Sequence, residues 1–128
     1  MTLANELVRV GVPPVTAGAI NSGNTAAVTA TSSSTLATAV ELQAGVNRVT
    51  GSDGVRLPSI GQPGDSVLVI NDTGSSIKVW PPTSSAAIGV PGTSFGAASA
   101  GAAYTQTLYA VVEFVCYSST LWAVKKSA

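Results

Sequence analysis

Short runs of alternating apolar and polar residues recur along the chain, separated by clusters of Gly, Pro, Ser, Asn and Asp. A period of two is typical of β-strands with one buried face, and such turn residues end strands. Helix formers are scarce between residues 24 and 50, and no N-cap followed by an acidic residue marks a helix start. The pattern predicts an all-β domain over residues 24–128. Strands are expected near 25–31, 38–43, 47–49, 55–57, 67–70, 77–80, 108–117 and 121–124.

Two pairs of these strands are predicted to form β-hairpins. The first joins Val67–Ile70 to Ile77–Trp80 through an Asn-Asp-Thr-Gly turn, and the second joins 108–117 to Leu121–Val124. Val67–Ile70 is apolar at every position, which is typical of a strand covered on both faces. About eight short strands with such turns predict an antiparallel β-sandwich or jelly-roll-like domain.

Residues 1–23 are expected to form an N-terminal arm and linker. Val8, Val10 and Val12 alternate with Leu7, Arg9 and Gly11, as in one short strand. Pro13-Pro14 then ends the strand, because proline cannot donate a backbone hydrogen bond to a neighbouring strand. This segment is either a frayed terminus or an arm that adds a strand to the sheet edge of a neighbouring subunit. In the second case its apolar side chains would fill pockets on that neighbour. The candidate partner contacts are Leu7, Val8, Val10 and Val12.

Composition indicates an assembled protein. Apolar residues make up 45% of the chain, but Ala and Val dominate them, and small side chains bury little area each. Only 9% of residues are charged, against roughly 25% in an ordinary domain, and the net charge is zero. A thin core makes a marginal monomer, and an uncharged surface tends to associate. We therefore expect a homo-oligomer or a subunit of a larger structure.

The residue inventory excludes much chemistry. There is no histidine, so neither a His-dependent nucleophile nor a His metal site can form, and the single cysteine excludes multi-Cys sites. Six scattered basic residues do not make a nucleic-acid-binding stripe. No apolar run approaches the roughly 20 residues of a membrane span, and the N-terminus lacks signal-peptide features. We expect no enzymatic activity, cofactor or metal, no nucleic-acid or membrane partner, and synthesis in a cytoplasm.

Four individual residues are candidates for chemistry. Glu113 lies within an apolar strand and needs a partner, but an exposed strand position is favoured over an acid–base role. Cys116 has no basic neighbour in the sequence, which favours a buried, inert thiol. Trp80 and Trp122 each fall at a predicted hairpin, where a packing role is favoured over a stacking platform for a sugar or base.

The order of strands and turns resembles small tailed-bacteriophage virion proteins of the capsid decoration (cement) or head-fibre type. The resemblance covers roughly residues 24–124 and consists of β-structure and turns without a chemical motif. It is carried by Asn47–Thr50, Gly54–Pro58, Gly64–Asn71, Ile77–Pro81, Phe114–Cys116 and Trp122.

The resemblance implies a β-sandwich that is often trimeric and that binds the major capsid protein. On this hypothesis the chain is assembled in the host cytoplasm, lies on the capsid surface of the virion, and stabilises the head. The arm would then contact either the capsid or the chain's own oligomer. The alternative is a phage-fibre or host-adhesion module that binds surface carbohydrate through Trp80, Trp122 or the tyrosines.

Overall fold

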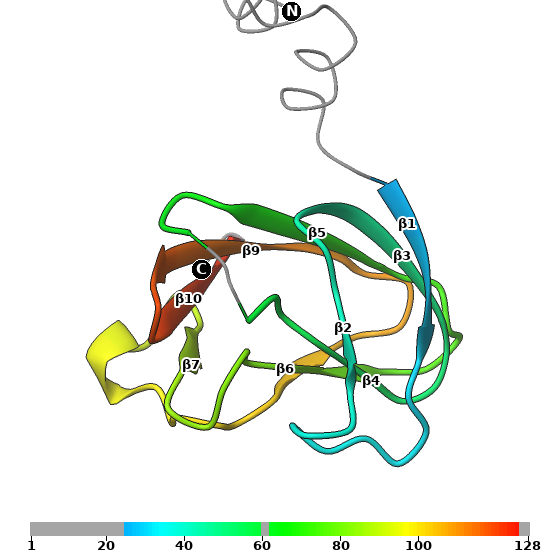
Figure 1. Ribbon diagram of the computed structural model, residues 1–128, viewed down its shortest axis with the longest axis horizontal. Helices are drawn as coiled ribbons and strands as arrows, with labels where there is room; N and C mark the ends of the chain where they lie inside the picture. Colours follow the sequence, from blue (N-terminus) through cyan, green and yellow to red (C-terminus); the bar gives the residue numbers. More distant parts are fainter. Residues whose placement is uncertain (1–24, 60–61, 126–128) are drawn as a thin grey trace, which may run out of the picture.

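The computed structural model describes residues 25–59 and 62–125, which form two β-sheets facing each other across one core (Figure 1). A short 3-10 helix, η1 (Phe95–Ala97), accompanies the strands. The predicted all-β class is confirmed. The predicted arm, residues 1–23, lies outside the described residues.

Ten strands make up the two sheets. The larger sheet has the order β1 (Thr25–Ala30), β3 (Gly45–Gly51), β5 (Ser66–Asn71), β9 (Val111–Ser118), β10 (Leu121–Lys125) and β7 (Ala87–Gly89). The smaller sheet has the order β2 (Val40–Glu41), β4 (Gly54–Arg56), β6 (Ile77–Trp80) and β8 (Tyr104–Gln106). Most of the expected strands are therefore present, although β2 is shorter than predicted.

The chain alternates between the sheets from β1 to β9, so successive strands face each other across the core and do not pair. β1, β3 and β5 consequently run parallel in one sheet, and β2, β4 and β6 run parallel in the other. Among the named strands of the described residues, β9 pairs antiparallel with β5 and β10, and β8 pairs antiparallel with β6. β7 and β10 also pair in parallel. The prediction of an antiparallel sandwich or jelly-roll-like domain is therefore not confirmed, because both sheets are mixed.

The two predicted hairpins have different outcomes. The closing hairpin is confirmed, because β9 and β10 pair antiparallel around residues 119–120. The hairpin predicted from Val67 to Trp80 is wrong: β5 and β6 lie in opposite sheets. Their connection arches across the core, and the Asn71 amide fixes that arch by donating hydrogen bonds to the carbonyls of Ser75 and Thr107. Both strands then direct valines into the core instead of sharing a ladder.

The core between the sheets is built from small aliphatic side chains around two large aromatic ones. Trp122 is 1% exposed and Phe114 is fully buried. The ring of Tyr104 meets that of Phe114 edge-on, with centroids 5.6 Å apart. The aliphatic members include Val49, Val55, Leu57, Val67, Val69, Ile77 and Val79. The interpretation of Trp122 as a packing residue is therefore confirmed, and this side chain cannot serve as a stacking platform.

Candidate interaction surface

The outward side of the six-stranded sheet, which we call the outer face, is predominantly apolar. Its side chains alternate with the core positions along each strand, and strand register brings them into rows across the sheet. Val115, for example, pairs with Ala123 on one side and Ser66 on the other. The apolar members are Val46, Leu68, Ile70, Val111, Val115, Tyr117, Leu121 and Ala123.

The β5 strand shows how the described chain leaves this face open. Val67 and Val69 are fully buried, whereas Leu68 and Ile70 on the outer face are half-buried. The prediction that this strand is covered on both faces is wrong within the described residues, where only the core side is covered. When a strand has apolar residues on both faces and only one face packs against the core, the other face is suited to binding a partner.

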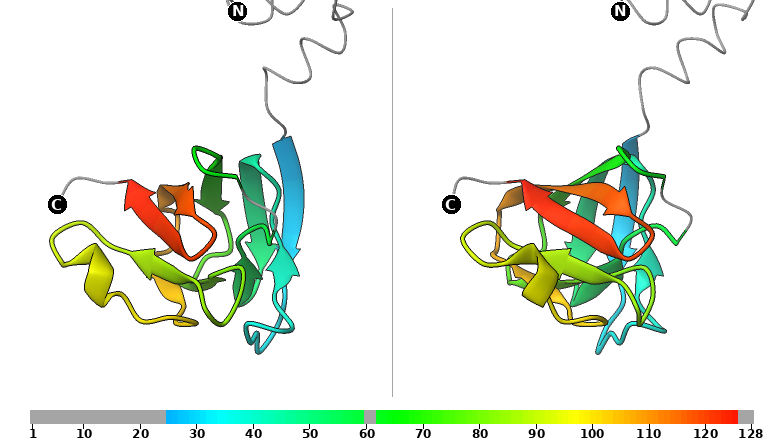
Figure 2. Two further views of the ribbon diagram at one scale, coloured as in Figure 1. Left: turned by 60° about the vertical axis from the view of Figure 1, so that its left-hand side comes forward. Right: turned by 90° about the vertical axis from the view of Figure 1, so that its left-hand side faces the viewer.

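An apolar groove with a volume of about 300 Å³ lies at one end of the outer face, lined by Phe95, Tyr117, Leu121 and Ala123. Phe95 is 39% exposed and Tyr117 is 73% exposed. The η1 helix, which carries Phe95, lies beside β7 (Figure 2). Polar groups that orient a small polar ligand are missing from this lining, so the groove suits an aliphatic or aromatic side chain better than a sugar.

A glycine on β7 sets the wall of the groove. A Cβ atom at Gly89 would lie 2.1 Å from Cδ1 of Phe95 and 2.9 Å from its Cε1. The ring of Phe95 therefore packs directly on the backbone of Gly89, in space that a side chain would fill. Through this contact, a residue on the edge strand β7 positions an aromatic ring contributed by a later segment.

Most charged side chains of the described residues form ion pairs. All four cations there form ion pairs, two of them with side chains on the outer face. The pairs are Arg48–Asp72 at 2.5 Å, Arg56–Glu41 at 3.0 Å, Lys78–Asp53 at 3.8 Å and Lys125–Glu113 at 3.5 Å. Such exposed pairs add little stability. Because each described cation already has an acidic partner, association with a binding partner should depend weakly on salt.

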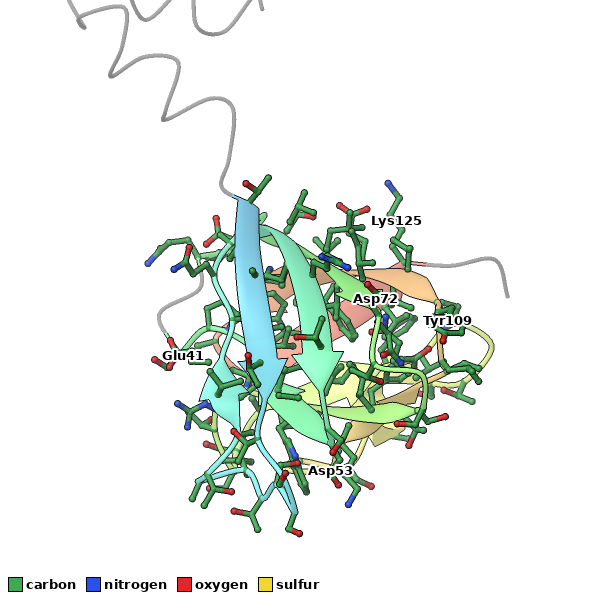
Figure 3. The ribbon with its side chains drawn as sticks, turned by 90° about the vertical axis from the view of Figure 1, so that its right-hand side faces the viewer. Glu41, Asp53, Asp72, Tyr109 and Lys125 are labelled. Carbon is green, nitrogen blue, oxygen red and sulfur yellow. The ribbon has the colours of Figure 1, made fainter. Side chains whose placement is uncertain are left out.

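Three carboxylates among the described residues lie apart from one another. Figure 3 shows Glu41, Asp53 and Asp72 at separate places on the molecule. Within residues 25–59 and 62–125, no three His, Cys, Asp or Glu side chains come together in a way that could hold a metal ion. The same part of the chain contains no helix long and apolar enough to cross a membrane.

Glu113, the acid in an apolar strand, has the partner that the sequence required. The hydroxyl of Ser66 donates a hydrogen bond to its carboxylate, and Lys125 lies beside it on β10. The Ser66 hydrogen bond is the main reason that the pKa of Glu113 lies below its ordinary value of 4.5; burial opposes the shift and Lys125 adds to it. This carboxylate is ionised at neutral pH and ties β5, β9 and β10 together.

We expect Ser66→Ala to reduce the acid sensitivity of folding. Because the pKa of Glu113 is lowered in the folded state, its stabilising contribution is present above about pH 4.5 and is lost as the pH falls. The backbone N–H of Ser34 lowers the pKa of Asp53 in the same direction, so wild type also loses stability on acidification for that reason.

The measurement is urea unfolding at pH 7 and pH 3. The free energy of unfolding should fall less between pH 7 and pH 3 for Ser66→Ala than for wild type. Thr105→Ala, at an exposed strand hydroxyl, is the control and should preserve the wild-type difference. An unchanged difference in Ser66→Ala would contradict the assigned cause.

Cys116 and Trp80 are both engaged by neighbours. Cys116 is 2% exposed, as predicted, and its thiol donates to the carbonyl of Ser118 at 3.3 Å. Burial, followed by the nearby charge of Asp65, raises the pKa of this thiol. Trp80 is half-buried, and its indole N–H donates to Oγ of Ser34 at 3.0 Å. Neither is a free reactive group.

The sequence-predicted contacts and the observed surface do not coincide. Leu7, Val8, Val10 and Val12 lie outside the described residues. Sequence reasoning missed Phe95 and the groove, because the position of that ring depends on Gly89. Two signals pointed toward the outer face: the doubly apolar β5 strand, and the alternate β9 row that ends at Tyr117.

Comparison with family models, curated proteins and solved structures finds no match for the chain. The fold and surface together define a two-sheet β-protein with an apolar, electrically balanced face.

Proposed function

We propose that this chain is a non-enzymatic virion structural protein, a capsid decoration or cement subunit that binds the outside of a phage head and stabilises it. The observation that carries the proposal is the outer face, a largely apolar sheet surface on which, of the described residues outside the sheet, Phe95 packs at the β7 edge. The proposal agrees with the resemblance to small tailed-phage virion proteins. It assigns no reaction, cofactor or metal to the chain.

Physical chemistry favours adhesion over chemistry for such a surface. Apolar area removed from water contributes roughly 25 cal/mol per Å², and a binding partner recovers this gain by covering Leu68, Val115 and Leu121. The ring of Tyr117 is a large, rigid side chain of the kind that anchors interfaces. The major capsid protein, presenting an apolar or aromatic side chain to the groove, is the proposed partner.

Oligomerisation would multiply this affinity. We propose a homo-oligomer because the core is thin and the chain has no net charge. The resemblance to small tailed-phage virion proteins makes a trimer the expected state. Once one subunit of a trimer is bound, contact by the second becomes intramolecular, which raises overall avidity. The arm residues Leu7, Val8, Val10 and Val12 remain candidate contacts with the capsid or with another subunit.

Substituting two residues that line the groove should weaken head binding strongly. We expect Tyr117→Ser with Leu121→Ser to weaken binding to undecorated heads at least about 30-fold, the scale of losing an interface anchor worth 2 kcal/mol. The measurement is co-sedimentation of the protein with purified heads over a range of concentrations, at 50 mM and 500 mM salt. Wild type should bind similarly at both salt concentrations.

Tyr109→Asn supplies the matched control. Tyr109 is 66% exposed but precedes β9, whereas Tyr117 lies near its far end. Its backbone φ of 58° is one that asparagine tolerates. This variant should bind heads like wild type. Failure of the wild-type protein to bind heads would refute the decoration role, and full binding by the groove variant would refute the assigned surface.

The second candidate is a fibre or adhesion module that binds carbohydrate. The exposed rings of Tyr109 and Tyr117 favour it, since aromatic faces can stack on sugars. The apolar lining of the groove disfavours it, because sugar recognition needs polar groups beside the ring. Saccharide-specific signal on a glycan array that disappears in Tyr117→Ser would support this function over decoration.

A further inference from the structure

The edge strand β1 presents a long, unprotected side. All six of its residues pair with β3, from Thr25 opposite Val46 to Ala30 opposite Gly51. On its other side no described strand pairs with it. The sequence Thr-Ala-Ala-Val-Thr-Ala contains no charge and no proline, the devices by which natural sheets block their edges. The other edge strands have only two or three residues.

The hydrophobic core is also open at this end. β1 and β2 are the first strands of the two parallel sets and lie near each other (Figure 3). Val28 on β1 and Val40 on β2 pack against the core, yet both are only half-buried. A further strand beside β1 would pair its free backbone groups and cover Val28 with its own side chains. This end therefore has both the hydrogen-bonding and the apolar features of a strand-addition site.

We propose that residues Leu7–Val12 of a second copy of this chain occupy the free edge of β1. The inference rests on the oligomeric subunit described under the proposed function and deepens it. The segment has the required pattern: Val8, Val10 and Val12 fall on one side of a strand and match the small, apolar core-facing row of β1, to which Val28 belongs. The capsid is then bound by the outer face, and the arm joins subunits.

The connection favours a second copy over the same chain. Twelve residues, 13–24, separate this segment from β1, whereas hairpin connections have about two to five residues. The connection begins with Pro13-Pro14, which favours extended chain leading away from the strand. Twelve extended residues span about 40 Å. This is twice the length of β1, which is about 20 Å. Successive exchange around a symmetry axis would close a ring in which each copy gives and receives one strand.

Disulfide trapping between two differently tagged chains tests the proposal. One chain carries Arg9→Cys and the other carries Ala27→Cys or Thr29→Cys, at outward positions of the donor segment and of β1. Adjacent strands hold Cα atoms at separations that a disulfide can bridge. After co-expression and mild oxidation, we expect a mixed dimer on a non-reducing denaturing gel. Arg9→Cys paired with Thr105→Cys, on the edge strand β8, is the matched control and should give no such band.

The outcomes separate this inference from the proposed function. Deletion of residues 2–14 should convert the oligomer to a folded monomer in light scattering. A deletion variant that stays oligomeric but no longer binds heads would place the arm on the capsid and overturn the inference, leaving decoration intact. A third variant carries Arg9→Cys and Ala27→Cys in the same chain. A disulfide within that chain combined with no mixed dimer between differently tagged chains would also overturn the inference, as would equal cross-linking to Thr105→Cys. Head binding by the full-length protein tests decoration independently of all these results.

Discussion

Replacing Asn71 with alanine is expected to lower the free energy of unfolding by about 3 kcal/mol. The side chain is 1% exposed and its amide nitrogen donates to the carbonyls of Ser75 at 2.9 Å, Thr107 at 2.9 Å and Gln106 at 3.2 Å. Its oxygen accepts from the backbone N–H and the hydroxyl of Thr73. Alanine would remove all of these hydrogen bonds from a buried position, which costs more than a lost surface contact.

Urea unfolding of three variants measures this effect. Asn71→Asp retains the shape of the side chain but loses the amide donor and buries a charge, so we expect a loss at least as large as for alanine. Thr73→Ala removes one partner at a less buried position and should cost about 1 kcal/mol. A loss below 1 kcal/mol for Asn71→Ala would show that the arch does not depend on this amide.

The same residue explains why strand positions were predictable and strand pairing was not. Alternation located β5 and β6, since it reflects which side chains face the core. The Asn-Asp-Thr-Gly connection between them has the composition of a hairpin turn, but Asn71 bonds to carbonyls 35 and 36 positions later in the sequence. A contact so distant in sequence leaves no local signal. The sequence therefore did not predict the parallel pairing of β1, β3 and β5 or of β2, β4 and β6, whereas it did predict the local β9–β10 hairpin.

The interaction surface was predictable only in part, for a related reason. The apolar outer positions of β5 and β9 are visible in the sequence, but their neighbours depend on sheet order. Phe95 becomes part of the groove because Gly89, six positions earlier, lacks a side chain beneath its ring. Glu113 and Cys116 were interpretable because each is judged by its own burial and partner. A shared surface requires the relative positions of several strands.

Gly54→Ala is expected to lower the free energy of unfolding by about 2–3 kcal/mol through overpacking. Gly54 is buried on β4, and a Cβ atom there would lie 2.0 Å from Oγ and 2.9 Å from Cβ of Ser34. It would also lie 3.1 Å from the carbonyl oxygen of Lys78, which pairs with Gly54 across the β4–β6 ladder. Rotation of Ser34 cannot relieve the clash cheaply, because its Oγ accepts the hydrogen bond from Trp80.

Urea unfolding with a double-mutant cycle distinguishes this clash from a general effect of losing glycine. Gly96→Ala is the matched control: the nearest atom to its new methyl group is 3.8 Å away, and we expect a change within about 0.5 kcal/mol. Ser34→Gly removes the two side-chain atoms of Ser34 that crowd the new methyl group but also the acceptor for Trp80, so alone it should destabilise the domain. Combined with Gly54→Ala, it should cost less than the sum of the two single losses. If the losses in the free energy of unfolding are strictly additive, the strain does not come from Ser34. It would then come from the carbonyl of Lys78, because β6 cannot move away without breaking its pairing with β4.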